Sequence, residues 1–323
     1  MRTGTTTPIE PGLPFTGPWL LAPMEGVTEP CFRGLVLARN PARELGGAFT
    51  EFVRVSDRAL PEATLRAHLG DERFDAPVGL QLMGATHEHV AETARRAVAA
   101  GAPLIDLNFG CPARGALRGC AGSALLREPR ALEQLTSVVV RAVPDTPVTA
   151  KIRAGFDDDT LLEDLARAAE AGGARMLTVH CRTRAEAYQP EVHWERIARA
   201  VAATRLPVCG NGGIADHADL TRMRTETGCR FAMVGHGALR DPWIFSGGCP
   251  SPREAARFLV EYATGLPQRR RVTRIKQLMR HWTAGALFGS AGYDQPERQR
   301  WLREPDPEQL IGYIEGAADM AVC

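Results

Sequence analysis

The chain has very little lysine and asparagine for its 323 residues. Lys151 and Lys276 are its only lysines among 39 basic residues, so the other 37 are arginine. Asparagine occurs only as Asn40, Asn108 and Asn211. This bias is typical of a GC-rich coding sequence, in which arginine replaces lysine wherever a positive charge is enough. Because arginine does not reproduce the compact, shiftable charge of lysine, the surviving lysines are candidates for functional positions.

Long apolar runs are absent as well, and no stretch is long enough to span a membrane. The first 17 residues lack the apolar core of a signal peptide. The eight cysteines form no C-x-x-C pair and no spacing typical of a disulfide framework or a zinc site. We therefore expect a cytoplasmic protein without a membrane anchor or a bound metal. The net charge of +1 indicates no general affinity for nucleic acid, so any such binding depends on a local patch.

Eight apolar runs rich in β-forming residues recur at regular intervals, at 19–24, 48–52, 78–83, 104–108, 148–152, 176–180, 208–211 and 231–234. Amphipathic, helix-like stretches lie between most of them, including 87–100, 129–142, 159–171, 193–204 and 217–227. This alternation predicts an α/β fold of the (β/α)8 TIM-barrel type. An open doubly wound sheet is the alternative, and the absence of G-x-G-x-x-G after the first run argues against a Rossmann dinucleotide site.

The pattern changes near residue 247, where a cluster of glycine and proline ends the last α/β unit. We expect the barrel to span 18–246 and a small helical domain to span 251–323, with helices at 253–264, 274–288 and 308–320. Residues 1–17 are rich in threonine, proline and glycine. We interpret them as a disordered lead-in.

The segment 106–112 is the most informative part of the chain. Residues 104–107 form a short apolar run, and Gly110 and Pro112 then end the predicted strand. Asn108 and Cys111 therefore lie at the carboxyl end of a parallel strand, where ligands bind in α/β folds. The alternative is that Cys111 is simply a small buried apolar residue, as many free cysteines are.

The residues at or just past the ends of the other predicted strands are Met24-Glu25, Glu51, Gln81, Lys151, His180, Asn211 and Gly235. Each one alone has an ordinary structural explanation, such as a loop cap or a satisfied core histidine. Together, amides, a cation and an imidazole on one rim suit a flat heteroaromatic cofactor that gains electron density on reduction. Glycine turns at 211–213 and 235–237 follow the last two strands, where barrels commonly bind phosphate.

A basic cluster occurs in the C-terminal region and consists of Arg269, Arg270, Arg271, Arg274, Lys276 and Arg280. One interpretation is the solvated face of a helix in an arginine-rich chain. The other is a groove beside the barrel mouth that follows a phosphate backbone with salt-dependent affinity.

Five motifs resemble the tRNA-dihydrouridine synthase family: 21–28 (LAPMEGVT), 106–112 (DLNFGCP), 151–153 (KIR), 179–183 (VHCRT) and 211–214 (NGGI). The resemblance implies a barrel that binds flavin mononucleotide (FMN) and a helical domain that binds tRNA. It also implies reduction of the C5–C6 double bond of a D-loop uridine, with NADPH as reductant. Cys111 matches the proton donor. The FMN-binding positions match Pro23, Met24, Glu25, Gln81, Lys151, His180, Asn211, Gly212, Gly213, Gly235 and His236.

Residues 51–55 (EFVRV) and 274–277 (RIKQ) resemble the bacterial C-type subfamily, which modifies the uridine at position 16. The family resemblance implies tRNA contacts at Arg54, Asn108 at the uracil edge, Arg153, Arg274 and Lys276. We expect a monomer. Two features depart from the family pattern. His236 stands where the family usually has arginine, and the loop 113–123 carries Arg114, Leu117 and Cys120 at positions usually occupied by other residues.

Three other classes of function share part of this pattern. An FMN-dependent dehydrogenase of a free pyrimidine or of dihydroorotate would use a similar rim but would not need the basic helical domain. A Schiff-base aldolase would use Lys151 but would not explain Gln81, Asn108 and Cys111 together. A non-catalytic tRNA-binding protein would keep the basic cluster and lose the rim.

Overall fold

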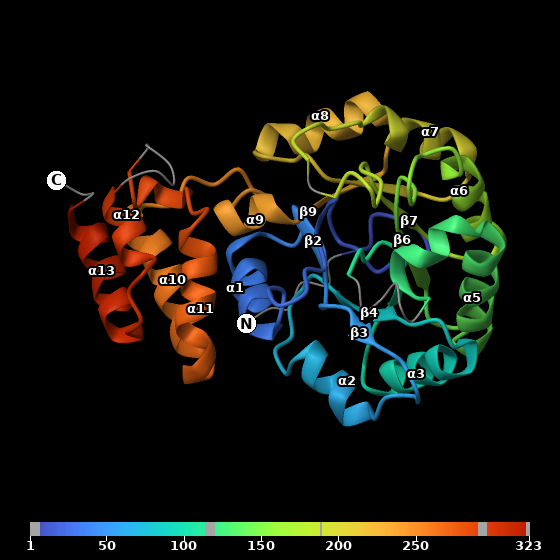
Figure 1. The fold of residues 1–323 in the computed structure, drawn as a ribbon, viewed down its shortest axis with the longest axis horizontal. Helices are drawn as coiled ribbons and strands as arrows, with labels where there is room; N and C mark the ends of the chain where they lie inside the picture. Colours follow the sequence, from blue (N-terminus) through green and yellow to red (C-terminus); the bar gives the residue numbers. More distant parts are fainter. Residues whose placement is uncertain (1–6, 114–119, 188, 290–295, 321–323) are drawn as a thin grey trace.

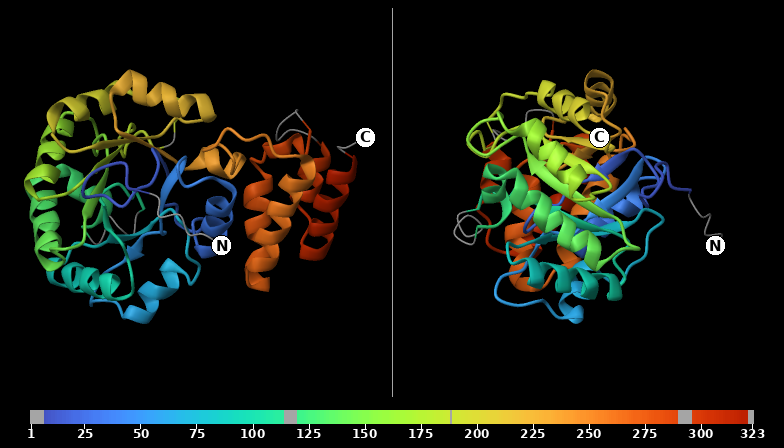
Figure 2. Two further views of the ribbon diagram at one scale, coloured as in Figure 1. Left: turned by 180° about the vertical axis from the view of Figure 1, so that it is seen from behind. Right: turned by 90° about the vertical axis from the view of Figure 1, so that its right-hand side faces the viewer.

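The computed structural model describes residues 7–113, 120–187, 189–289 and 296–320. A barrel of parallel strands surrounded by helices forms the larger part of the molecule, and a group of C-terminal helices stands beside it (Figures 1 and 2). Within the described ranges, every helix is too short or too polar to cross a membrane.

The sheet contains nine parallel strands: β1 (Trp19–Leu21), β2 (Leu45–Phe49), β3 (Val53–Arg54), β4 (Val78–Met83), β5 (Ile105–Asn108), β6 (Val148–Arg153), β7 (Leu177–His180), β8 (Val208–Asn211) and β9 (Phe231–Val234). Their order is β2-β1-β9-β8-β7-β6-β5-β4-β3, and an additional pairing of β2 with β4 closes eight of them into a barrel. The two-residue strand β3 extends beside β4. The predicted eight-stranded barrel is therefore confirmed.

The helices around the barrel are α1 (Pro30–Arg39), α2 (Glu62–Leu69), α3 (His87–Ala99), α5 (Pro129–Ala142), α6 (Leu162–Ala171), α7 (Glu195–Ala203), α8 (His217–Thr227) and the short α9 (His236–Arg240). A 3-10 helix, η1 (Gly122–Arg127), precedes α5. Helix α5 shows why these segments pack on the sheet, because Leu132, Leu135, Thr136 and Val139 repeat at helical spacing and are all buried.

The C-terminal helices are α10 (Pro252–Gly265), α11 (Gln268–Met279), α12 (Pro296–Trp301) and α13 (Pro307–Met320), with a 3-10 turn, η2 (Ala284–Ala286), after α11. A capping box of Ser251 and Glu254 starts α10. The predicted helix at 274–288 was wrong at both ends. Helix α11 begins after Pro267 and ends at Met279, and Gly285, at a φ of 63° within η2, prevents a continuous helix to residue 288.

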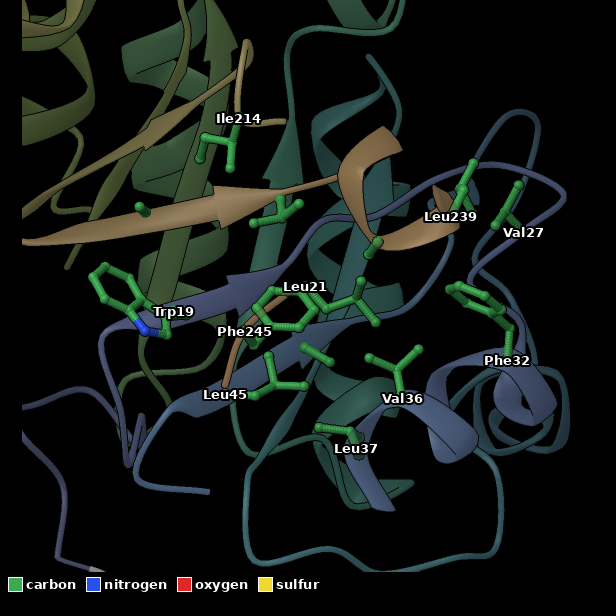
Figure 3. Packing of buried hydrophobic residues seen from close by; sticks show 14 of the residues in the cluster. Trp19, Leu21, Val27, Phe32, Val36, Leu37, Leu45, Ile214, Leu239 and Phe245 are labelled. Atoms are coloured by element: carbon green, nitrogen blue, oxygen red, sulfur yellow. The ribbon is translucent and has the colours of Figure 1, made fainter. Parts of the chain in front are cut away.

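Apolar contacts join the C-terminal helices to the barrel through α1. Phe32 of α1 lies 6.0 Å from Phe258 and 5.7 Å from Tyr262 of α10, measured between ring centroids. Figure 3 shows Phe32 and Val36 of α1 beside Leu21 and Leu45 of the first two barrel strands. Helix α1 therefore connects the two parts of the molecule through one continuous core.

The disordered lead-in was a wrong prediction for the part of residues 1–17 that the structure describes. Phe15 is fully buried between Phe49 and Phe231, with ring centroids 5.9 and 5.5 Å away, and Leu13 is buried beside them. Arg230 also donates to a carboxylate oxygen of Glu10 at 2.7 Å. This segment fills the end of the barrel at which the strands begin, although its polar composition gives no periodic signal. Residues 1–6 lie outside the described ranges.

Candidate active site

A cavity of about 490 Å³ opens at the carboxyl ends of the strands, which is a typical size for a small-molecule site. Its wall includes most of the residues predicted for the site: Pro23, Met24, Glu25, Asn108, Cys111, Lys151, Arg153, His180, Asn211, Gly212, Gly213, Gly235 and His236. The strand register explains this convergence, because Asn108 is paired with Lys151 and His180 with Asn211 on neighbouring strands.

Lys151 supplies a partly buried cation to the cavity wall from β6. Its Nζ donates to Oδ1 of Asn211 at 2.8 Å, and Nδ2 of Asn211 donates to the carbonyl of Met233 at 2.8 Å. Burial lowers the pKa of Lys151 to about 8, with a further decrease from Arg153 and a smaller opposing effect of Asp106. The ammonium group is therefore predominantly charged at neutral pH and is held in one position by an amide.

His180 supplies a neutral imidazole. Burial, and then the positive charges of Lys151 and Arg153, hold its pKa well below the usual value. Its Nδ1 accepts the backbone N–H of Arg182 at 3.3 Å, which assigns the ring proton to Nε2. The imidazole therefore presents an N–H donor rather than a second cation.

Cys111 combines both interpretations made from the sequence. Its side chain is buried and packs with Met83 and Ala121, and it also lines the cavity. Burial is the main cause that raises the pKa of its thiol. The thiol is therefore protonated at neutral pH, which is the state required of a general acid.

The backbone that carries Cys111 is held on several sides. Oδ1 of Asn108 accepts the N–H groups of Gly110 at 3.0 Å and Cys111 at 2.9 Å. Arg153 donates from Nε to the carbonyl of Gly110 at 2.9 Å. Ser123 donates to the carbonyl of Cys111 from both N and Oγ, at 3.1 and 2.9 Å. The position of the thiol is therefore fixed by the strand end, a neighbouring strand and the start of η1.

Gln81 does not belong to the cavity wall in this structure. It is completely buried; its Nε2 donates to Oδ2 of Asp106 at 2.6 Å, and its Oε1 accepts from Nδ2 of Asn108 at 2.7 Å. Its place is therefore beneath the wall, and its contact with a cofactor stays a prediction.

The turn after β8 requires glycine for steric reasons. Gly212 and Gly213 have φ values of 103° and 76°, which other residues rarely adopt. A Cβ at Gly212 would also lie 2.9 Å from Sγ of Cys181, and one at Gly213 would lie 2.5 Å from Val192. Backbone rather than side chain therefore borders the cavity here. Gly235 is different, because a Cβ there would meet only ordinary contacts, the nearest at 3.4 Å.

The residues predicted to contact tRNA occupy three kinds of environment. Arg54 is exposed on β3, and Lys276 is half-buried on α11. Arg274 of α11 lies against Gly26 in the loop after β1 and donates to Oε1 of Gln277 at 2.9 Å. Arg153 is buried and donates to the carbonyls of Thr183 and Ala187, both at 3.2 Å. Its direct contact with tRNA stays a prediction, and its observed role is to support the wall.

Two further polar side chains, which the sequence had not assigned to the site, line the cavity. Arg182 belongs to the VHCRT motif, and its Nε donates to the carbonyl of Glu191 at 3.0 Å. Gln277 reaches the cavity from α11, one helical turn after Arg274. The sequence signal for Gln277 was its place in the RIKQ motif. The C-terminal helices therefore contribute directly to the wall of the barrel cavity.

The donor set suits a flavin better than a metal. In the described part of the chain, no group of three or more histidine, cysteine or acidic side chains is arranged to hold a metal ion. The wall instead offers the ammonium of Lys151, the Nε2–H of His180 and exposed backbone at Gly212 and Gly213, which fit a polar ring edge and an anionic tail. Residues 114–119 of the unusual loop, including Arg114 and Leu117, lie outside the described ranges.

These features define a (β/α)8-barrel enzyme with its site at the carboxyl ends of the strands. The chain belongs to the dihydrouridine synthase family, since the family model described as "Dihydrouridine synthase (Dus)" matches residues 20–282. This confirms the family inferred from the motifs.

Three relatives illustrate the similarity, and each is named a tRNA-dihydrouridine(16) synthase. The protein of Pseudomonas syringae pv. tomato is 40% identical over 69% of this chain and 71% of its own length. The Cupriavidus necator protein is 38% identical over 76% of this chain and 80% of its own. The Shewanella oneidensis protein is 38% identical over 92% of this chain and 97% of its own, so the similarity includes the C-terminal helices.

Proposed function

We propose that this enzyme reduces a D-loop uridine of tRNA to 5,6-dihydrouridine, with FMN as the bound cofactor, NADPH as the reductant and position 16 as the target. The observation that carries this proposal is the presence of a protonated thiol, Cys111, and a partly buried cation, Lys151, in the wall of one cavity. Family membership and the names of the relatives support the reaction and the position.

The residues that would hold FMN are those of the cavity wall. Lys151 and His180 would donate to the pyrimidine edge of the ring, and the backbone at Gly212 and Gly213 would approach the phosphate. When bound, FMN supplies the hydride that reaches C6 of the uracil. Lys151 is suited to stabilise the negative charge that reduction creates, because Asn211 holds its ammonium in place.

Cys111 would deliver the proton that C5 requires. Its thiol is kept protonated by burial, and Asn108, Arg153 and Ser123 fix its backbone, so the acid is ready before the substrate arrives. Splaying the uridine out of its loop costs a few kcal/mol, less where the loop is already unstacked.

For tRNA we propose the barrel, 18–246, as the catalytic part and residues 251–323 as the RNA-binding part. Arg274 supports this division, because it touches the loop after β1 while Gln277 on the same helix lines the cavity. Arg54 lies exposed on β3, at the barrel rim. We also propose a monomer in the cytoplasm.

Two measurements test the proposal. The purified protein should be yellow and should release FMN on denaturation, as judged by its absorption spectrum and chromatography. A colourless protein that takes up no FMN on reconstitution would refute the flavin assignment. Deletion of the gene should abolish dihydrouridine at position 16 of tRNA, as mapped by primer extension. Loss at position 20 with retention at 16 would contradict the position while leaving the family reaction in place.

A further inference from the structure

A buried carboxylate beneath the cavity takes no part in the chemistry described so far. Asp106 stands between two apolar residues of β5 and is almost completely buried. Its side chain accepts two hydrogen bonds, from Nε2 of Gln81 at 2.6 Å to Oδ2 and from Oγ1 of Thr149 at 2.5 Å to Oδ1. Burying a carboxylate is costly, so its presence in a barrel interior indicates a task that an apolar residue does not perform.

The hydrogen bonds from Asp106 continue toward Cys111. Gln81 donates a hydrogen bond from Nε2 to Asp106, so its Oε1 faces Asn108. This oxygen accepts a hydrogen bond from Nδ2 of Asn108. This leaves Oδ1 of Asn108 to accept the backbone N–H groups of Gly110 and Cys111. The chain of contacts therefore runs from Asp106 through two side-chain amides to the backbone of the thiol.

The ends of this chain determine its direction. A carboxylate only accepts hydrogen bonds, and a backbone N–H only donates them. Each side-chain amide between them has an oxygen that accepts and a nitrogen that donates. Without neighbours of fixed role, such an amide could be rotated by 180° and still fit. With Asp106 ionised, both Gln81 and Asn108 have a single orientation in which every contact is satisfied. If Asp106 stopped being an acceptor-only group, the reversed orientation of Gln81 would become possible.

We propose that Asp106 is a positioning residue for Cys111, acting through the amides of Gln81 and Asn108 to hold the Gly110–Cys111 backbone and therefore the thiol in place. Only the consequence for uridine reduction rests on the proposed function. The chain of hydrogen bonds from Asp106 through Gln81 and Asn108 to the backbone of Gly110 and Cys111, here called the relay, is a property of the protein alone and is measurable without substrate.

The charges near Asp106 favour the ionised form at neutral pH. Lys151 on β6 and the thiol of Cys209 on β8 both lie close enough to interact with it. Burial raises the pKa of Asp106 to about 6, and the hydrogen bonds from Gln81 and Thr149 and the charge of Lys151 limit that rise. Since the protonated acid can donate a hydrogen bond, the relay should lose its fixed direction as the pH falls through about 6.

Three variants of the holoenzyme separate the relay from its surroundings. Asp106→Asn replaces two acceptors by one acceptor and one donor, so Gln81 can bind in either orientation. Gln81→Met removes the link while leaving the charge of Asp106 beside Lys151. Thr149→Val is the matched control, because it removes the other hydrogen bond of the same carboxylate and leaves the bond to Gln81.

Hydrogen exchange followed by mass spectrometry reports on the relay directly. Exchange of the peptide containing the Gly110 and Cys111 amides should accelerate by roughly five- to tenfold in Asp106→Asn and Gln81→Met, as expected for the loss of about one net hydrogen bond. It should stay at the wild-type rate in Thr149→Val. In the wild type, protection of this peptide, corrected for intrinsic exchange, should decrease as the pH falls from 7.5 to 5. If the Gly110–Cys111 peptide keeps full protection in Asp106→Asn, in Gln81→Met and in the wild type at pH 5, the proposal is wrong. The measurement on the wild type decides this even if one variant folds poorly.

Stopped-flow kinetics then connect the relay to the reaction. In Asp106→Asn, oxidation of the reduced flavin by tRNA should slow by about 10- to 100-fold, the usual effect of a misplaced reacting group, and more than reduction by NADPH slows. Equal slowing of both steps with unchanged exchange at Gly110–Cys111 would assign Asp106 to the electrostatics of Lys151 and overturn the proposal. If exchange separates the variants as expected while the wild type does not act on tRNA, the proposed function fails and the relay stands.

Discussion

The two ends of the barrel are built from the same strands and have opposite compositions. At the end where the strands begin, Phe15, Phe49 and Phe231 pack together with apolar neighbours. At the carboxyl end, a hydrogen bond joins Lys151 and Asn211 in the wall of the cavity. The apolar side chains need no hydrogen-bond partner, whereas Lys151 and Asn211 at the polar end satisfy one another.

This difference shows how the fold separates stability from chemistry. The apolar cluster around Leu13 and Phe15, here called the plug, stabilises the barrel by burial of apolar surface. This stabilisation does not depend on the direction of any hydrogen bond. A network of amides and charges contributes little net stability but fixes where each donor and acceptor points. Substitutions at the two ends should therefore have different signatures, one in unfolding and the other in catalysis.

The largest expected effect is at the carboxyl end. Cys111→Ala should reduce dihydrouridine formation by roughly 10²–10⁴-fold, the usual contribution of a positioned acid, while the free energy of unfolding changes little. Reduction of the flavin by NADPH should stay near the wild-type rate. The control is Cys120→Ala, since Cys120 is exposed. A defect in Cys120→Ala and none in Cys111→Ala would contradict the assignment of the acid.

The opposite signature is expected from the plug. Phe15→Ala should lower the free energy of unfolding by about 3–5 kcal/mol, the usual cost of removing a buried phenyl ring, as measured by urea denaturation. The fraction that remains folded should keep its kcat. Phe52→Ala is the matched variant at the other end, where the ring is half-buried and lines the cavity, so it should cost less stability and more activity. Equal losses of stability in both variants would remove the distinction between the two ends.

A pH profile tests the cation of the polar end. Because the pKa of Lys151 is lowered to about 8, its charge is present below that pH and is lost as the pH rises through it. Flavin reduction by NADPH should therefore slow above about pH 8 in the wild type. Lys151→Met should be slow at every pH, by roughly 10- to 100-fold, as when one stabilising donor is removed. Lys151→Arg should lose the pH dependence but also be slower, since its planar group does not replace the ammonium. A wild-type profile that is flat up to pH 9.5 would argue against this role.

The smallest effect is expected at the proposed tRNA contacts Arg54 and Lys276, which belong neither to the apolar end of the barrel nor to the cavity wall. Lys276→Ala and Arg54→Ala should each reduce the slope of log affinity for tRNA against log salt by about one unit, without changing flavin content or stability. Arg167→Ala is the control, because this exposed arginine lies on α6 and pairs with Asp164. Filter-binding titrations at several salt concentrations measure the slope, and an unchanged slope in both test variants would remove these residues from the tRNA surface.

The sequence predicted the polar end of the barrel well, because strand ends carry a clear signal. Lys151, His180 and Asn211 each follow a short apolar run, and the parallel barrel necessarily brings such positions to one rim. Cys111 was found for the same reason. What the sequence could not show is depth: Gln81 lies inside β4, two residues before its end at Met83, and it is buried beneath the cavity wall.

The plug and the C-terminal helices were harder to predict. Phe15 is one aromatic residue among threonines, prolines and glycines, so its burial depends on the closed barrel rather than on local pattern. The start of α11 was missed because its first turns are a run of arginines without apolar periodicity. Asp106 was not recognised, since a single acid in an apolar strand becomes informative only when its partners Gln81 and Thr149 are known.

The closure of the barrel has a consequence for the timing of synthesis. The plug is held by the contact of Glu10 with Arg230, the residue before β9, and these two residues lie 220 positions apart in the chain. Strand β1 itself pairs with β9. At the usual 5–20 residues per second, the first strand waits roughly 10–45 s on the ribosome for its partner. Until β9 is synthesised, the apolar residues and the unpaired edge of β1 are exposed and can form non-native contacts with other strands or chains. The nascent chain should therefore depend on chaperones until β9 emerges.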